Sequence, residues 1–336
     1  MIDKTYDYAN LDALPEFADQ ANSLVEEAFA YQKNFKFSVD FAPLSGPRNY
    51  KNRHILIDRD TSRVVAHIGT RLRNFVWEGE VIPVAMIGGI AVASSERGQG
   101  LFKLLFEKVL SSLHSQCALY VLWSDKHEMY QKWHFYLAGQ QWCYRSTLAE
   151  KDARSTRLSA LSQSEVQELA QIYRQQINQQ YFSPLRDESD WEDLKDIESA
   201  ELLLVDGGYA FRGKGMDLQG ILHDSAHRGG VNGLLQSLGG AGVLWAAKNE
   251  PVPDEILQDL QQVGLWRPNT HPMALRKLSH LLKHTVHFRD DVFVVEKDGL
   301  NVRLNAEELL AEIFDYGRHR LRSSAIPVYI GGLDSI

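Results

Sequence analysis

The run IGGIAVASSERGQGLFKLL, from Ile87 to Leu105, decides which fold the sequence predicts. The segment Met86 to Val92 is apolar and β-prone, and a short polar loop, residues 93–96, follows it. After Gly100 the pattern becomes helical, with apolar residues spaced to share one face: Leu101, Leu104, Leu105 and Val109. A strand, a turn and a helix start direct unpaired backbone N–H groups at one point, where a phosphate or pyrophosphate fits. Gly98 and Gly100 carry no Cβ, so such a ligand can lie against the main chain.

Spacing separates the phosphate sites that use this arrangement. A P-loop requires Gly-Lys-Ser/Thr, whereas Leu101-Phe102 follows Gly100 here. A Rossmann fingerprint requires a third glycine or alanine where Lys103 stands, and its turn follows the strand directly. Asp125, at the end of a later predicted strand, would serve the ribose in that case, so a dinucleotide site stays open as the weaker alternative.

The third interpretation is a family resemblance. Ile90-Ala91-Val92 with Arg97-Gly98-Gln99-Gly100-Leu101 resembles the acetyl-CoA motif of the GCN5-related N-acetyltransferases, Gln/Arg-x-x-Gly-x-Gly/Ala. Ser95 stands where that family has Gln or Arg, and Arg97 supplies a cation two residues later. The resemblance implies that acetyl-CoA is bound along this segment and that a backbone N–H near Ile90 to Val92 polarises the thioester carbonyl. The binding residues it implies are Ile90, Ala91, Val92, Arg97, Gly98, Gln99, Gly100, Leu101 and Phe102.

A second segment extends the resemblance. Met129 to Phe135, MYQKWHF, is similar to the family's YxKxGF segment, with His134 where glycine is common. The resemblance implies that Tyr130 is catalytic and protonates the departing thiolate of coenzyme A. The alternative for Tyr130 is a helix tyrosine packed on the core.

The general base is open. Family members often place a carboxylate on the central strand, and Met86 to Val92 has none, so water, a backbone carbonyl or a distant carboxylate would take the proton. Asp125 is the nearest candidate, although an N-cap role for it or for Ser124 is favoured. In one tandem type of the family the terminal carboxylate is the proton acceptor, which makes the Ile336 carboxylate a candidate. The alternative for this end of the chain is a final strand on a sheet edge.

Composition restricts the partners. The 336 residues are 44% hydrophobic and 24% charged, which are ordinary globular values, and the length suggests two domains. A formal charge of −8 without a basic run argues against nucleic acid, and it suits an amine substrate or simply a solvated surface. Two cysteines build no disulfide or metal framework. We expect a cytoplasmic protein, because neither a signal sequence nor a membrane-spanning run is present.

In the first half the pattern predicts a helix, antiparallel strands, the glycine turn with its helix, and a buried strand. The expected ranges are a helix over 14–31, a loop over 35–51, strands over 54–57, 64–71 and 75–77, a helix to about 115 and a strand over 118–123. Phe41, Tyr50 and Trp77 are aromatic candidates for the wall of an acceptor pocket, although each is more often a core residue. This order agrees with the acetyltransferase core.

The second half repeats the first in outline after a polar linker at 148–156. The pattern predicts a helix over 158–176, a hairpin over 202–212, and strands over 218–223 and 243–245. Ser225 to Val231 parallels Ser94 to Gly100, with Val231 in place of the second glycine, and Trp245 with Lys248 parallels Trp123 with Lys126. We expect Val231 to crowd a pyrophosphate, and no tyrosine equivalent to Tyr130 follows. The second copy is therefore predicted to lack acetyl-CoA.

Tandem copies resemble the double-domain acetyltransferases of the enhanced-intracellular-survival and mycothiol synthase types, in which the second copy helps to shape the acceptor pocket. The fold class expected is α/β (α+β): two folds, each a mixed, mostly antiparallel sheet flanked by helices. The expected domains are a catalytic domain (1–150), a degenerate copy (151–280) and a small strand–helix appendage (281–336). In the appendage we expect strands over 292–296 and 301–304 and a capping box from Asn305 to Glu308.

The sequence therefore predicts an acetyl-CoA-dependent N-acetyltransferase that acts on a primary amine of a small molecule by direct attack. Two alternatives stay open: an acyl-CoA-binding regulatory module without turnover, and an aminoacyl transferase that uses charged tRNA. The acceptor and the oligomeric state do not follow from the sequence.

Overall fold

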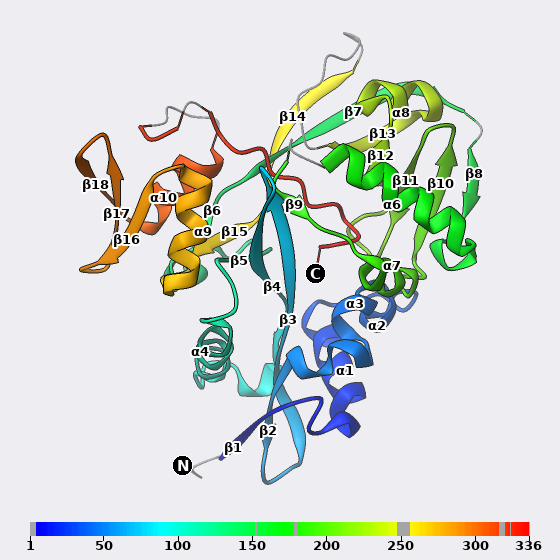
Figure 1. Cartoon of the computed structure of the whole chain (residues 1–336). Helices are drawn as coiled ribbons and strands as arrows, with labels where there is room; N and C mark the ends of the chain where they lie inside the picture. Colours follow the sequence, from blue (N-terminus) through cyan, green and yellow to red (C-terminus); the bar gives the residue numbers. More distant parts are fainter. Residues whose placement is uncertain are drawn as a thin grey trace.

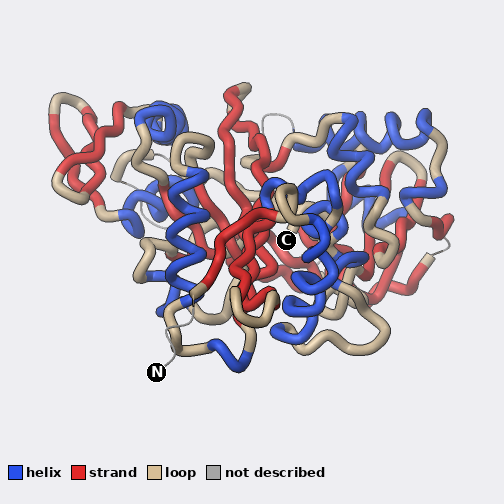
Figure 2. The backbone as a smooth tube through the Cα atoms, turned by 90° about the horizontal axis from the view of Figure 1, so that it is seen from below, coloured by secondary structure: helices blue, strands red, loops and turns tan. Residues whose placement is uncertain are grey.

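A computed structural model describes residues 5–151, 153–177, 181–246, 256–315, 320–322 and 324–335. Two large mixed sheets, each with helices on its faces, lie beside a small three-stranded sheet (Figures 1 and 2). This agrees with the α/β class expected from the sequence. The long strands β3 (Arg63–Trp77) and β4 (Glu80–Val92) run through the middle of the molecule.

The first sheet has the order β1-β2-β3-β4-β5-β15-β6, and β9 pairs with β3. β4 and β5 are parallel, whereas the other neighbours are antiparallel. The sequence predicted two strands where the single strand β3 runs, because Arg71, Arg73 and Asn74 interrupt the apolar pattern without ending the strand. The remaining strands are β1 (Tyr6–Asn10), β2 (Arg53–Asp58), β5 (Leu119–Leu122), β6 (Tyr136–Leu137), β9 (Ser183–Pro184) and β15 (Leu265–Pro268).

Successive side chains of a strand point to opposite faces of this sheet, and helices cover both faces. Ile55 and Ile57 pack with α1 (Ala18–Ala28), whereas Leu56 packs with α4 (Leu101–Leu113). Leu104 is an exception to the predicted apolar face of α4, because it is exposed. The loop expected over 35–51 instead contains short helices, because Pro43 and Pro47 start helical turns. The short elements here are η1 (Pro15–Phe17), α2 (Phe37–Asp40), α3 (Ala42–Ser45), η2 (Pro47–Asn52), η3 (Ser94–Glu96) and α5 (His127–Gln131).

The second sheet has the order β14-β7-β13-β12-β11-β10-β8. Residues expected to form a polar linker are strands here, because the partners of β7 and β8 come from distant parts of the chain. The strand expected over 218–223 lies further along, at β12, and the predicted hairpin is β10 with β11. The strands are β7 (Gln140–Glu150), β8 (Arg154–Thr156), β10 (Ala200–Val205), β11 (Gly208–Gly213), β12 (Ile221–His227), β13 (Gly239–Ala246) and β14 (Leu257–Gln262).

The two large sheets exchange strands. β7 follows the first sheet in the sequence but lies between β13 and β14 of the second sheet. β15 comes late in the sequence but lies between β5 and β6 of the first. The predicted divisions at residues 150 and 280 stay a prediction, and sheet membership crosses the first of them. Helices η4 (Leu158–Ala160), α6 (Gln163–Ile177), α7 (Glu188–Lys195) and α8 (Gly230–Leu238) accompany the second sheet.

The small sheet packs with two helices beside the first sheet. The sequence predicted two of its strands, β17 (Val292–Lys297) and β18 (Leu300–Leu304), and missed β16 (Thr285–Arg289). Asn305 and Glu308 form the expected capping box at the start of α10 (Ala306–Phe314). Trp77 is buried in the core that this region shares with the first sheet and with α9 (Pro272–Leu282), which agrees with the core alternative for this residue.

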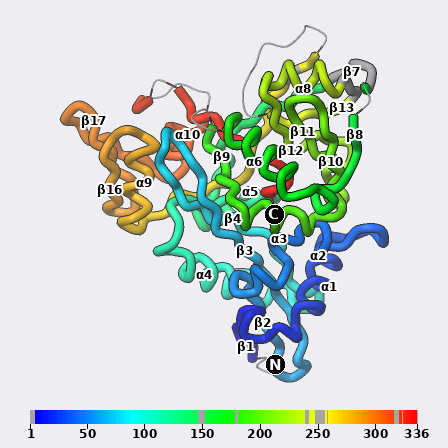
Figure 3. Tube along the Cα trace, turned by 45° about the vertical axis from the view of Figure 1, so that its right-hand side comes forward, coloured from blue at the N-terminus to red at the C-terminus, as the bar shows by residue number. Residues whose placement is uncertain are grey.

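The C-terminal tail, residues 324–335, enters between the two large sheets (Figures 1 and 3). Val328 forms an isolated parallel bridge with Phe182, and the described tail contains no strand. Its apolar side chains are buried: Ala325, Ile326, Val328, Tyr329, Ile330 and Leu333. The described tail is therefore an irregular segment and not a final strand, although it hydrogen-bonds to Phe182, next to β9, and to His223 of β12. No described helix is long and apolar enough to cross a membrane.

Candidate functional site

In the first sheet β4 extends beyond the end of β5, so one side of β4 has no neighbouring strand there. The two strands pair only from Val84 with Leu119 to Ile87 with Leu122, and β5 ends there. β4 continues through Gly88 to Val92 with β3 as its partner on the other side. Among the described residues, this stretch of β4 has no strand partner on the β5 side. Its backbone groups on that side can therefore pair with a ligand.

The glycine turn lies directly after this open edge. Gly98 and Gly100 adopt left-handed backbone conformations, with φ of +81° and +80°. A Cβ placed on either glycine would meet no atom within 4 Å, so the space over the turn is open. In the described part of the chain, the backbone N–H groups from Gly98 to Lys103 donate to no protein acceptor. A concave turn with free donors at the start of α4 fits a pyrophosphate.

Side chains behind the turn hold its shape. Glu96 is buried and accepts hydrogen bonds from the Tyr6 hydroxyl, at 3.0 Å, and from Gln99 Nε2, at 2.9 Å. The Tyr6 hydroxyl also lies 2.9 Å from Gln99 Oε1. The Gln99 side chain therefore fixes the loop, and its backbone N–H remains available. Arg97 is exposed and makes no ion pair with the described residues; its Nε reaches the Val92 carbonyl at 3.4 Å.

Tyr130 lies in α5 within an aromatic cluster that also contains Phe102 of α4. The two ring centroids are 5.9 Å apart, and the rings are perpendicular. Burial raises the pKa of Tyr130 to about 12, although a hydrogen bond with Ser124 lowers it. The phenol therefore keeps its proton at neutral pH and can act as a donor. His134 has a φ of +61°, in the left-handed region that favours glycine, the residue that the resemblance implied at this position.

The other predicted candidates have different surroundings. Asp125 is exposed, and the cap of α5 is Lys126, whose N–H donates to Ser124 Oγ. Ile336 and Lys248 lie outside the described residues, so their predicted roles stay predictions. Phe41 lies under Lys214, and Tyr50 lies beside Arg53.

The second sheet opens in the same way, but the chain itself fills the opening. β12 pairs with β13 only at Ile221 and Leu222. Beyond that point the Gly332 N–H donates to the His223 carbonyl at 2.7 Å, so the C-terminal tail covers this edge. A Cβ on Gly332 would lie 2.3 Å from the His223 ring, and one on Gly331 would clash with Asp224. The tail and β12 therefore lie in close contact.

The turn of the second copy is also occupied. The Gly229 N–H donates to His227 Nδ1 at 2.8 Å, and a Cβ on Gly233 would lie 2.3 Å from the same ring. Val231 was expected to crowd a ligand. Its side chain is instead buried with Leu234 and Leu235, because the first turn of α8 directs it into the core. The His227 imidazole fills the turn in its place.

A buried ionic cluster anchors the C-terminal tail. Arg186 pairs with Asp224 and with Asp334, which lies 2.7 Å away, and Arg73 of β3 also contacts Asp334, at 3.3 Å. The guanidinium of Arg186 holds the pKa of Asp334 below its usual value, although burial opposes this shift. Lys214 donates to the carbonyls of Gly332 and Ser335. Sequence reasoning missed this cluster, because its members are far apart in the chain.

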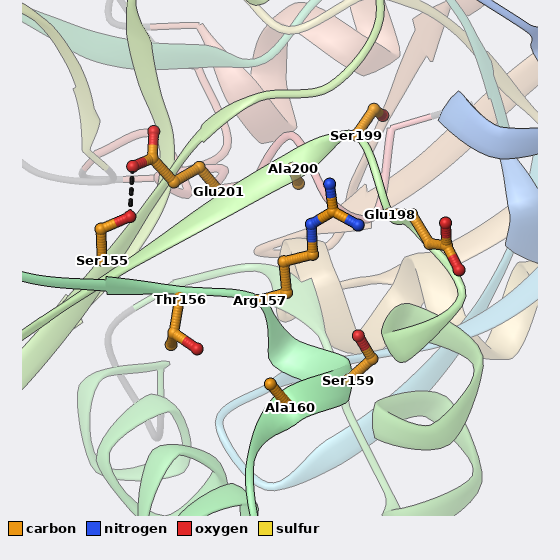
Figure 4. A pocket seen from close by; sticks show the side chains of 9 residues that line it. All are labelled: Ser155, Thr156, Arg157, Ser159, Ala160, Glu198, Ser199, Ala200 and Glu201. Carbon is orange, nitrogen blue, oxygen red and sulfur yellow. Dashed lines mark hydrogen bonds between the residues drawn. The ribbon is translucent and has the colours of Figure 1, made fainter.

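A surface pocket of about 560 Å³ lies elsewhere, between β8, η4 and β10 (Figure 4). Its lining combines polar and charged side chains with two alanines: Ser155, Thr156, Arg157, Ser159, Ala160, Glu198, Ser199, Ala200 and Glu201. Ser155 donates to Glu201, so part of this polarity is satisfied internally. The lining of this pocket includes neither Tyr130 nor any residue of the glycine turn. The described residues contain no group of three or more metal-ligating side chains.

Comparisons with known proteins find a matching domain and similar folds. Residues 13–138 match the family model of the acetyltransferase (GNAT) domain. A search of curated proteins found no match. A GCN5-related N-acetyltransferase from Kribbella flavida has a similar structure, with a TM-score of 0.59 at 14% identity over 92% of this chain and 88% of its own.

Two more solved structures are similar over most of the chain. A GCN5-related N-acetyltransferase from Anabaena variabilis is similar with a TM-score of 0.58 and 13% sequence identity, and the match covers 90% of this chain and 85% of that one. Eis1 from Mycobacterium abscessus is similar with a TM-score of 0.58 and 12% sequence identity, and the match covers 89% of this chain and 85% of Eis1. These likenesses extend the fold beyond the matched domain. Residues 13–138 thus match the acetyltransferase (GNAT) domain, and the solved structures share the fold over most of the chain.

Proposed function

We propose that the protein transfers an acetyl group from acetyl-CoA to a primary amine of a small molecule, and that only the first copy does so. One observation carries the proposal: the bare glycine turn, with free N–H groups from Gly98 to Lys103, lies beside the open edge of β4. Bound acetyl-CoA supplies an activated thioester carbonyl. The turn residues, with Arg97 as a cation, would hold its pyrophosphate.

The residues of this site then have distinct tasks. Backbone groups from Ile90 to Val92 bind along the open edge and direct an N–H at the acyl oxygen, where negative charge develops. The amine nitrogen forms the new C–N bond as the C–S bond breaks. Tyr130 gives its phenolic proton to the leaving sulfur, since burial keeps this phenol protonated. The amine loses its proton to water or to a carboxylate, with Asp125 and Ile336 as candidates.

The Tyr130→Phe variant tests the proposal, with free-thiol release from acetyl-CoA measured over a panel of primary amines. We expect turnover to fall by about 100-fold while acetyl-CoA affinity, measured by calorimetry, stays unchanged. The wild-type dependence on this phenol should persist to high pH, because its pKa is about 12. Tyr209→Phe is the control, because the Tyr209 hydroxyl is also buried and makes no hydrogen bond with the described residues.

Two outcomes would overturn the proposal. A wild-type protein that binds acetyl-CoA but acetylates no amine would be a regulatory module. A protein that binds NAD and not acetyl-CoA would have a dinucleotide site at the turn.

A further inference from the structure

A buried arginine and histidine lie behind the open edge of β4. His67 of β3 and Arg53 of β2 are both fully buried. Arg53 Nε donates to His67 Nε2 at 3.1 Å, and His67 Nδ1 lies 2.7 Å from the Gly89 carbonyl oxygen. Gly89 belongs to a bulge of β4, because Gly88 pairs with Gly69 and Ala91 pairs with His67, which leaves two residues opposite Ile68.

The partners fix the protonation of His67. A guanidinium can only donate, so Nε2 must accept, and a carbonyl can only accept, so Nδ1 must carry the proton. The imidazole is therefore the neutral Nδ1–H tautomer. Burial, and then the charge of Arg53, hold the pKa of His67 well below its usual value, so it stays neutral across the physiological range.

The bond from His67 orients the next amide. In a planar trans peptide the carbonyl and the following N–H point in opposite directions. Because the Gly89 carbonyl points at His67, the Ile90 N–H points away from it. His67 lies beside Phe37 of α2, whereas the Ile90 side chain packs with the core under α4, the helix that starts at the glycine turn. Gly89 itself has a φ of +58°, and a Cβ there would lie 3.0 Å from Phe37, so only glycine fits this bulge.

Arg53 adds charge to this chain of hydrogen bonds. Its Nη1 and Nη2 each donate to a neutral oxygen, the Ser45 carbonyl at 2.7 Å and Asn22 Oδ1 at 2.8 Å. It forms no ion pair with any described residue, and burial lowers its pKa only to about 10, so it keeps its charge at neutral pH. Hydrogen bonds in series polarise one another, and a buried, unneutralised cation at one end strengthens each donor along the series.

We infer that Arg53 and His67 are positioning residues that aim and polarise the Ile90 N–H toward the acyl oxygen of acetyl-CoA. The inference rests on the proposed function and goes further, because it assigns the oxyanion donor to one amide and gives the reason for its direction. Neither side chain touches substrate, since both are fully buried.

Two variants separate positioning from packing. His67→Leu keeps an apolar side chain of similar size but removes the donor to Gly89. His67→Asn retains a donor near the position of Nδ1. His54→Leu is the matched control, because His54 is a buried histidine of the same sheet whose Nδ1 meets the Tyr8 hydroxyl instead.

The main readout is the carbonyl stretch of acetyl-CoA, labelled with carbon-13 at the carbonyl and bound without an amine, in isotope-edited infrared spectra. Wild type should lower the stretching frequency relative to free acetyl-CoA. His67→Leu should give a smaller shift and a kcat about 10- to 100-fold lower with an unchanged acetyl-CoA Kd. His67→Asn should restore most of the frequency shift and most of kcat. His54→Leu should match wild type in both measurements.

The outcomes are distinguishable. If wild type does not bind acetyl-CoA, the proposed function fails. If it binds acetyl-CoA and His67→Leu leaves the carbonyl stretch unchanged, the inference is wrong while the proposed function stands. A His54→Leu variant that loses the frequency shift as fully as His67→Leu would likewise overturn the inference, because general packing would then explain the effect.

Discussion

The two glycine turns of this chain have similar sequences and opposite surroundings. In the first, the N–H groups from Gly98 to Lys103 are free and β4 continues beside an open edge. In the second, the His227 ring takes the Gly229 N–H, and the C-terminal tail takes the open edge of β12. Whether such a turn has room and free donors for a phosphate thus depends on what the rest of the chain leaves unpaired, as much as on the glycines.

The largest effect should come from filling the first turn. Gly100→Leu places a side chain where acetyl-CoA would lie, so we expect its affinity to fall by about 1000-fold, or about 4 kcal/mol, in calorimetry. Gly299→Leu is the control: Gly299 has a φ of +78° and open space as well, in the β17–β18 turn, so it costs the same backbone strain. Unchanged affinity in Gly100→Leu would refute the site.

Breaking the anchor of the tail should destabilise the second copy. Asp334→Asn leaves Arg186 and Arg73 short of a buried counter-charge, so we expect the free energy of unfolding to fall by about 3 kcal/mol in urea. Asp7→Asn, which removes a pair exposed on the surface with Arg59, should change it little.

The same variant tests whether the tail alone closes the second copy. We expect one acetyl-CoA per chain in both wild type and Asp334→Asn, because His227 still fills the second turn. Two bound molecules per chain in the variant would contradict the comparison.

Buried histidines in both copies should make stability depend on pH. Burial lowers the pKa of His54 to about 4 and that of His223 to about 3. The unfolded chain binds these protons near pH 6.5 and the folded chain does not, so stability falls as pH falls below 6.5. Between pH 6.5 and 5 each histidine should cost about 2 kcal/mol. Urea unfolding of His54→Leu and His223→Leu should each show a weaker pH dependence than wild type, and an unchanged slope would contradict the assignment.

The smallest effect compares two arginines at matching positions of the turns. Arg97→Ala removes a free cation beside the first turn, so we expect acetyl-CoA affinity to fall about tenfold, with less effect at high salt. Arg228→Ala removes a cation that already pairs with Glu168 beside the closed turn, so it should leave affinity unchanged. Equal losses in the two variants would show that the second turn also attracts the ligand.

Local patterns predicted much of the fold and the first site. The strand, Gly98, Gly100 and α4 are neighbours in sequence, so their periodicity and glycines were sufficient to predict the turn. The same reasoning missed His67, although a histidine at an inward position of the apolar strand Val64 to Ile68 was a signal. It also misjudged Val231, because the direction of a side chain at a helix start depends on which face the helix packs.

By itself the sequence determined most helices of the two copies, the glycine turn and the aromatic segment around Tyr130, since each depends on contacts within a few residues. Only the tertiary structure decided that β7 and β15 exchange sheets, that Asp334 meets Arg186, and that the tail covers β12. These contacts join residues that lie from 89 positions apart, as for Glu150 and Gly239, to 149, as for Leu119 and Pro268. Their choice depends on which surfaces remain unpaired once the sheets have formed, and no local pattern records that.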